Sequence, residues 1–125
     1  MNEQVLVVDA QQYKIKYGIN DCKLIEVNYN NYINFITNNS LFLDRGLAEI
    51  NPKYKQIVSY CVIRYKDFLF TTKRLKKQTE SRLHDKLSIG LGGHINNYDT
   101  KQSDNIINYG CNRELNEEQS KGLGL

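Results

Sequence analysis

The stretch GLGGHINNYDTKQSDNIINYGCNRELNEE, residues 90–118, decides the fold of this chain. A short strand over residues 86–91 is expected to run into the glycine pair Gly92-Gly93. A polar loop follows, and a helix begins after it. Asp104 can cap that helix, because its carboxylate accepts hydrogen bonds from N–H groups of the first turn. This order brings a charged helix next to a glycine-rich stretch of backbone.

The expected helix is amphipathic. At about 100° per residue, one stripe is apolar, and it consists of Ile107, Cys111 and Leu115. The opposite side carries amides, namely Asn105, Asn108, Asn112, Asn116 and Gln119. The glutamates do not follow this division. Glu114 and Glu118 lie close to the apolar stripe, and Glu117 lies at its margin.

These glutamates have two interpretations. An acidic helix end is ordinarily a solvated face, but solvated glutamates should share the amide side of this helix. Negative charge in the last turns also opposes the helix dipole, and like charges four residues apart repel. Arg113 supplies one counter-charge, and a bound cation would supply the rest. Mg²⁺ and Mn²⁺ favour carboxylate, carbonyl and water oxygens, so the second interpretation is a divalent metal site.

The glycines also have two interpretations. Gly90, Gly92 and Gly93 can mark a strand that ends in a turn, or they can let the backbone turn sharply and approach a ligand. Gly-Gly alone does not separate the two.

These residues resemble the Nudix box, G-x5-E-x7-R-E-U-x-E-E-x-G-U, in which U is aliphatic. RELNEE, residues 113–118, matches R-E-U-x-E-E at every fixed position, and Gly92-Gly93 is similar to the glycine pair that opens the box. SIGLGGHIN, residues 88–96, resembles a Nudix subgroup with a lengthened loop after G-G-H-I-N, and KQIVSYCVI, residues 55–63, resembles its first core strand. The resemblance covers roughly residues 42–118.

The chain departs from the box in three places. The loop after Gly93 is about six residues longer than the standard spacing. Asn105 stands where the first box glutamate is expected, and Asp104 is the nearest carboxylate. After Glu118 the pattern x-G-U is replaced by QSK. The chain ends at Leu125, where the family fold would continue with further strands and a helix, so the C-terminal part of the domain is expected to be missing.

The resemblance implies an α/β fold, in which a Nudix-like mixed sheet packs against the box helix. Residues 1–51 would form an N-terminal α/β extension of the same domain, and residues 52–125 the core. The implied function is hydrolysis of a nucleoside diphosphate linked to another moiety, with Mg²⁺ or Mn²⁺ as cofactor. Two alternatives remain open: a Nudix-like module that binds a nucleotide or a protein without turnover, and a fragment of a longer enzyme.

The resemblance also implies a role for each box residue. Glu117 and Glu118 would hold the metal, with the Gly92 carbonyl as a further ligand. Glu114 would be a metal ligand or the base that takes a proton from water. Arg113 would orient the glutamates through ion pairs. Gly93 would lie close to the phosphates.

Composition limits the partners. The chain has 125 residues, enough for one domain, and a net charge of +3, too small an excess to indicate nucleic acid. There is no basic N-terminal signal region and no apolar run of about 20 residues, so neither secretion nor a membrane span is expected. Three widely spaced cysteines indicate reduced thiols and a cytoplasmic protein. An unfinished sheet would leave an open edge, which favours a homo-oligomer.

The N-terminal section is expected to contain a strand over residues 3–10 and a second one over residues 13–17 that pairs with it. A helix is expected over residues 25–37, where apolar residues recur at helical spacing. Its tyrosines could stack on bases, but such a stripe is more often core. A turn at Asn51-Pro52 precedes the Nudix-like part.

Residues 56–65 are rich in Val, Ile and Tyr and predict a buried strand. A turn at Lys66-Asp67 and a returning strand over residues 68–72 complete a hairpin. The basic run over residues 73–77 is either a solvated loop or a phosphate grip. Arg74 is the best candidate for the grip, because a guanidinium binds phosphate through two parallel hydrogen bonds. The lone histidines, His84 and His94, are expected at the surface or behind the site.

Overall fold

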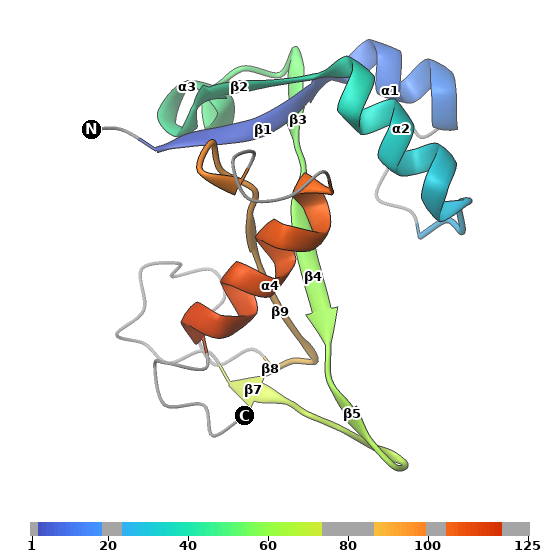
Figure 1. The fold of residues 1–125 in the computed structure, drawn as a ribbon, viewed down its shortest axis with the longest axis vertical. Helices are drawn as coiled ribbons and strands as arrows, with labels where there is room; N and C mark the ends of the chain where they lie inside the picture. Colours follow the sequence, from blue (N-terminus) through green and yellow to red (C-terminus); the bar gives the residue numbers. More distant parts are fainter. Residues whose placement is uncertain (1–2, 19–23, 74–86, 100–104, 119–125) are drawn as a thin grey trace.

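Strand β1 (Gln4–Asp9) is the middle strand of a three-stranded sheet. The computed structural model describes residues 3–18, 24–73, 87–99 and 105–118. β1 pairs antiparallel with β2 (Ser40–Asp44) along one edge and with β3 (Tyr54–Gln56) along part of the other. Figure 1 shows this three-stranded sheet above, with the remaining strands running down from it.

Residues 5–8 of β1 are buried, because their side chains alternate between two faces and each face is covered by a helix. Leu6 and Val8 form one apolar cluster with Ile36 of α2 (Tyr29–Asn39). Val5 and Val7 form a second cluster with Ala48 of α3 (Arg45–Ile50). The strand expected over residues 3–10 is therefore confirmed, and it is the most deeply buried element described.

The second N-terminal strand, expected over residues 13–17, is wrong. These residues belong to helix α1 (Ala10–Tyr17). Asp9 caps its start, since its side chain accepts hydrogen bonds from the N–H groups of Gln11 and Gln12 at 2.9 and 3.0 Å. Gly18 closes its end with a left-handed φ of 67°. The two caps outweigh a weak alternation of apolar residues.

The helix expected over residues 25–37 is present as α2 but begins later. Asn28 fixes the start, because its side chain accepts a hydrogen bond from the N–H of Asn31 at 3.0 Å. Tyr32 and Phe35 of this helix pack against the core, as does Tyr13 of α1. The Tyr13 ring also contacts the rings of Tyr32 and Phe35. The aromatic stripe is therefore a packing surface.

The single buried strand expected over residues 56–65 is wrong in two respects. The segment divides into β3, β4 (Val58–Val62) and β5 (Arg64–Tyr65). Along β4 the exposure alternates: Ser59 is buried and Cys61 half-buried, whereas Val58, Tyr60 and Val62 are exposed. Only one face of β4 is covered, so Val58, Tyr60 and Val62 point to solvent.

The rest of the sheet structure consists of short antiparallel pairs. The hairpin at Lys66-Asp67 is confirmed, but its returning strand is shorter than the expected residues 68–72: only β6 (Phe68–Leu69) pairs with β5. β7 (Thr72–Lys73) pairs with β8 (Leu87–Ser88). β9 (Gly90–His94) pairs with β4, from Val58↔His94 to Val62↔Gly90. Helix α4 (Ile106–Glu118) packs against β9 and β4 (Figure 1).

The turn expected at Gly92-Gly93 is absent. β9 continues through both glycines, and the positive-φ glycine within the described ranges is Gly18. A β-carbon on Gly90 would collide with the ring of Tyr60, and one on Gly92 with the carbonyl oxygen of Ser59. These glycines serve close packing and not an unusual backbone angle.

The N-terminal section contributes more of the core than an extension would. It supplies most of the buried apolar residues, namely Val5, Leu6, Val7, Val8, Ile36 and Ala48. Later residues add Ile57 and Ile95. Besides its contacts with β9 and β4, helix α4 packs Ile106 and Ile107 against the cluster that contains Leu6 and Val8. β1 therefore covers part of the box helix.

None of the helices in the described ranges has the length and apolar character that a membrane crossing requires.

Cys61 of β4 and Cys111 of α4 are free thiols that face each other. Burial and the neighbouring Cys111 raise the pKa of Cys61. Cys22 lies outside the described residues.

Candidate functional site

Helix α4 presents the predicted charged residues. Its first turn is capped by Asn105, whose side-chain oxygen accepts a hydrogen bond from the N–H of Asn108 at 3.0 Å. Asp104, the expected cap, lies outside the described residues. The amide face is exposed at Asn108, Asn112 and Asn116, as the helical spacing predicted.

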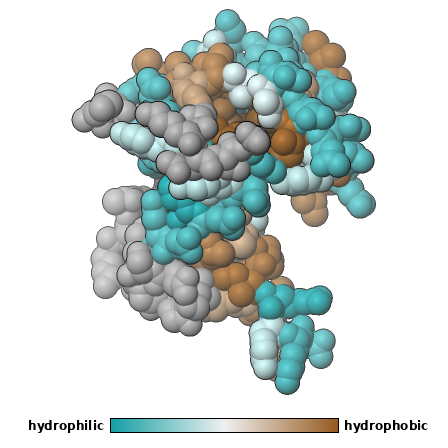
Figure 2. Space-filling view, in the orientation of Figure 1, coloured by the Kyte–Doolittle hydropathy of each residue, from teal (hydrophilic) through white to brown (hydrophobic). Residues whose placement is uncertain are grey.

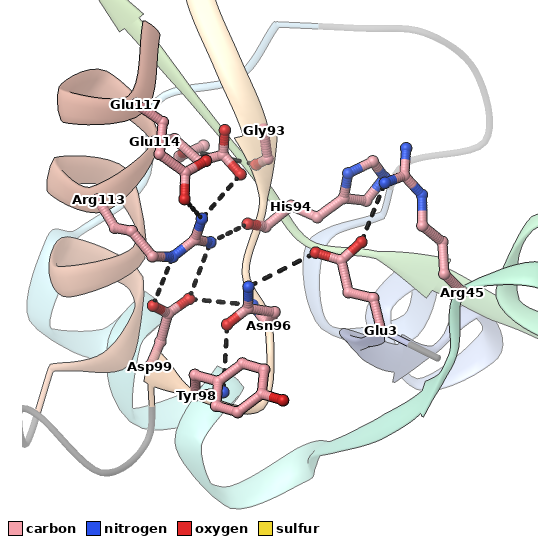
Figure 3. Close-up of polar contacts among 11 residues, drawn as sticks. Glu3, Arg45, Gly93, His94, Asn96, Tyr98, Asp99, Arg113, Glu114 and Glu117 are labelled. Atoms are coloured by element: carbon pink, nitrogen blue, oxygen red, sulfur yellow. Dashed lines mark hydrogen bonds and ion pairs between the residues drawn. The ribbon is translucent and has the colours of Figure 1, made fainter. Parts of the chain in front are cut away.

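Arg113 is the centre of the polar network on α4. Its Nε donates to Oδ1 of Asp99 at 2.8 Å, and its Nη2 donates to Oδ2 of Asp99 at 3.2 Å. Nη2 also donates to the backbone carbonyl of His94 at 2.9 Å. The Arg113 side chain is only 19% exposed. The guanidinium is therefore fixed between the helix and the end of β9 (Figure 3).

The remaining edge of this guanidinium faces the glutamates. Nη1 donates to Oε1 of Glu114 and to Oε1 of Glu117, at 3.1 Å in both cases. The Arg113 guanidinium thus forms ion pairs with three carboxylates, so negative charge exceeds positive charge in this network. The hydrogen bonds that Arg113 donates to Asp99 raise the pKa of Arg113 above its already high ordinary value, although burial opposes this. Arg113 therefore keeps its charge at any physiological pH.

Asp99 is the functional residue that the sequence analysis missed. Its side chain is 0% exposed, and besides Arg113 it accepts a hydrogen bond from the N–H of Asn96 at 3.0 Å. Gly110 of α4 makes room for it, because a β-carbon there would lie 2.9 Å from its Oδ2. A signal was present, because Asp99 is a carboxylate in the lengthened loop between Gly93 and α4.

Gly93 accommodates Glu114. The Glu114 side chain is 17% exposed, and its carboxylate lies where a β-carbon of residue 93 would be. Gly93 also accepts a hydrogen bond at its carbonyl from Oγ of Ser59 at 3.4 Å. Gly92 lies one position earlier in β9, opposite Tyr60. Gly93 therefore lies directly beneath Glu114 of α4.

The other predicted site residues differ in how they are placed. Glu117 is 53% exposed. Glu118 ends α4, but its side chain is not among those described. Arg74 lies outside the described residues, so the phosphate grip stays a prediction. A cavity of about 330 Å³ adjoins the network, lined by Tyr109, Asn112, Arg113, Asn116 and Glu117.

Comparisons with known proteins bear on the fold of this chain. No protein-family model matches the chain. Protein YmaB of Bacillus subtilis (strain 168) is 44% identical over 75 residues, which is 59% of this chain and 36% of YmaB. The crystal structure of Tm1382, "a putative Nudix hydrolase", superposes with a TM-score of 0.79 and 30% identity over 92% of this chain. The fold is Nudix-like. The chain spans 57% of Tm1382, and about a third of YmaB.

The Nudix-like site can be tested for its fit to a divalent metal. Within the described ranges, no three His, Cys, Asp or Glu side chains form a ready metal cluster. Glu114 and Glu117 do converge on one nitrogen of Arg113, and Glu118 follows on the same helix. Carboxylate and backbone carbonyl oxygens are the donors that Mg²⁺ and Mn²⁺ prefer. The donor chemistry therefore fits such an ion.

Proposed function

We propose that this chain carries the metal-binding part of a Nudix-type pyrophosphohydrolase, which hydrolyses a nucleoside diphosphate linked to another moiety. The main support is the Arg113 network. In a Nudix-like fold, one fixed guanidinium gathers Glu114 and Glu117 over the glycines of β9. This excess of negative charge, held close to a glycine-rich strand, suits a divalent cation and the phosphate oxygens that accompany it.

Each residue has a defined task in this proposal. Glu117 and Glu118 hold Mg²⁺ or Mn²⁺, with the carbonyl of Gly92 as a further ligand. When bound, such an ion neutralises charge on the diphosphate and lowers the pKa of a water molecule. Glu114 either joins the metal ligands or acts as the base. Arg113, itself held by Asp99, fixes the position of both described glutamates.

The proposed reaction is a hydrolysis of the diphosphate. A water oxygen forms a bond to one phosphorus, and the bond from that phosphorus to its leaving oxygen breaks. The leaving oxygen takes the electron pair, and the proton of the water passes to Glu114 or to solvent. Gly93 and Arg74 would contact the phosphates, Arg74 through its two parallel N–H groups.

Calorimetric titration with Mn²⁺ tests the metal site. We expect the wild-type chain to bind Mn²⁺ and the double variant Glu114→Gln/Glu117→Gln to bind it far more weakly, because two carboxylate charges are lost. Asn112→Ala, an exposed change on the same helix, is the matched control and should bind as the wild type does. Equal heats of binding for the wild type and the double variant would refute the proposed metal site.

Hydrolysis of nucleoside diphosphate derivatives, assayed with and without Mg²⁺, tests the reaction. We expect release of a phosphate-bearing product only with the metal present, and none from the double variant. Tight Mn²⁺ binding without any turnover would instead support a binding module.

A further inference from the structure

The turn that follows β9 is held by the N-terminal strand. The N–H of Leu6 donates to the carbonyl of Ile95 at 2.8 Å, and the N–H of Asn97 donates to the carbonyl of Gln4 at 3.2 Å. Between them, Val5 and Asn96 form an isolated antiparallel bridge. β3 covers β1 only from Val7 onwards, so the first half of this edge is left for the turn.

This turn delivers Asp99 to Arg113. Asn96 is buried, and its side-chain oxygen accepts a hydrogen bond from the N–H of Tyr98 at 3.1 Å, which closes the turn. The backbone N–H of Asn96 donates to Asp99, which fixes the carboxylate toward the helix. Figure 3 shows Asp99 on one side of the Arg113 guanidinium, with Glu114 and Glu117 on the other.

A side-chain link extends this network back to β1. The Asn96 amide nitrogen lies 3.5 Å from Oε2 of Glu3, at the long limit of a hydrogen bond. Glu3 is itself held by Nη1 of Arg45 at 2.9 Å. Arg45 also pairs with Glu49, at 3.2 Å, four residues further along α3. Glu3 and Glu49 thus share one arginine. Figure 3 shows Glu3 between Arg45 and Asn96.

We propose that Asn96 and Glu3 are positioning residues of the metal site. Glu3 orients the Asn96 amide, Asn96 orients Asp99, and Asp99 sets Arg113 and thereby the two glutamates. The proposal rests on the proposed function, because it takes Glu114 and Glu117 as metal ligands. It makes the N-terminal strand, which lies outside the Nudix box, a working part of the site.

Mn²⁺ affinity measured by calorimetry, together with the thermal midpoint of each variant, tests this. We expect Asn96→Ala and Glu3→Ala to raise the Mn²⁺ Kd by about threefold to tenfold, at or below the usual range for partners behind metal ligands. Glu49→Ala is the matched control, since it removes a glutamate from the same arginine without touching Asn96. It should leave the Kd within about twofold of the wild type.

A rescue separates positioning from general stability. Asn96→Asp keeps the acceptor for Tyr98 but replaces the donor that faces Glu3 with a second negative charge, so it should weaken Mn²⁺ binding. Adding Glu3→Gln restores a donor–acceptor pair with the roles exchanged, and should recover most of the affinity.

Unchanged affinity in Asn96→Ala and Glu3→Ala, an equal loss in Glu49→Ala, or a double variant no better than Asn96→Asp would each overturn the positioning role. A wild-type chain that binds Mn²⁺ no better than Glu114→Gln/Glu117→Gln would instead overturn the proposed function.

Discussion

Gly92 and Gly93 are neighbours in β9, yet a methyl group would meet a different obstacle at each. At Gly92 it would press against the backbone carbonyl of Ser59 in the paired strand. At Gly93 it would press against the carboxylate of Glu114, the far end of a flexible side chain. Backbone in a ladder cannot move aside easily, whereas a side chain can rotate. The first glycine therefore protects the sheet, and the second protects the position of a proposed ligand.

Alanine substitutions at the two glycines should separate these roles. We expect Gly92→Ala to lower the free energy of unfolding by about 1–3 kcal/mol. We expect Gly93→Ala to cost less stability but to raise the Mn²⁺ Kd by roughly tenfold, because Glu114 is displaced. Urea unfolding and Mn²⁺ calorimetry on both variants provide the two measurements. If both variants lost the same unfolding free energy and the same Mn²⁺ affinity, the two glycines would not have separate roles.

Arg74 should contribute more to phosphate affinity than its lysine neighbours. A guanidinium can make two parallel hydrogen bonds to a phosphate, whereas an ammonium acts as a point charge. We expect Arg74→Ala to weaken binding of a nucleoside diphosphate roughly tenfold, and Lys77→Ala to have a smaller effect. Equilibrium binding at one ionic strength compares them. Losses that are alike, or absent from both, would identify the basic run as a solvated loop.

At the scale of elements, helices α1 and α2 meet through tyrosines. The hydroxyl groups of Tyr13 and Tyr32 are 3.1 Å apart, and the pKa of Tyr32 is raised, chiefly by burial and then by Tyr13. The folded state therefore holds the Tyr32 proton more tightly than the unfolded chain, in which the pKa is near 10. Stability from this group is fully present below pH 10 and falls as the pH rises above it.

Urea unfolding between pH 9 and pH 11 can measure this dependence. Above pH 10 we expect the wild type to lose up to about 1.4 kcal/mol per pH unit through Tyr32. Tyr32→Phe should reduce this slope. Tyr65→Phe, at an exposed position in the β5–β6 hairpin, should leave it unchanged. Identical slopes in the wild type and Tyr32→Phe would show that Tyr32 ionises as easily in the folded state as in the unfolded one.

The sequence predicted α4 well because its signals are local. Helical spacing placed Asn108, Asn112 and Asn116 on an exposed face and Glu114 beside the apolar one. The same kind of reasoning failed for residues 13–17, where weak alternation suggested a strand. There the caps at Asp9 and Gly18 favour a helix, and both were present in the sequence. Giving more weight to caps than to a short alternation would have corrected the prediction.

The candidate site was predictable only where it lies on one helix. The positions of Arg113, Glu114 and Glu117 follow from a spacing of one to four residues. Asp99 reaches Arg113 because its turn is hydrogen-bonded to β1, and no local pattern contains that contact. For the same reason, dividing the chain into an extension (residues 1–51) and a core (residues 52–125) did not reveal that β1 helps to cover α4.

At the scale of the whole molecule, the outer face of β4 is an apolar surface. Val58, Tyr60 and Val62 point away from α4 and are exposed, and Ile89 before β9 is also exposed. Figure 2 shows that further apolar surface is exposed beside α4, in the lower part of the molecule. In the described part of the chain, β4 and β9 form a two-stranded sheet, so each has an outer edge without a strand partner. Such surfaces favour association.

We therefore expect the 125-residue chain to form an oligomer at micromolar concentration. Val58→Lys/Val62→Lys should shift it toward the monomer, because charges replace the apolar contact. Gln11→Lys/Gln12→Lys adds the same charge at exposed positions of α1 and should leave the oligomer intact. Sedimentation equilibrium on all three proteins measures this. A wild-type monomer that is stable and turns over a diphosphate briskly would contradict the expectation.

The central place of β1 also affects how the chain reaches its final structure. Asn96 lies 93 positions after Glu3, yet the two are neighbours, and Ile95 closes the same apolar cluster as Leu6. Contacts between residues so distant in sequence form slowly, because a long loop must close before they can contribute. During synthesis, β1 cannot complete its contacts until the turn after β9 and the start of α4 have left the ribosome. Until then, the apolar cluster that contains Leu6 and Val8 stays partly open to chaperones and to other nascent chains.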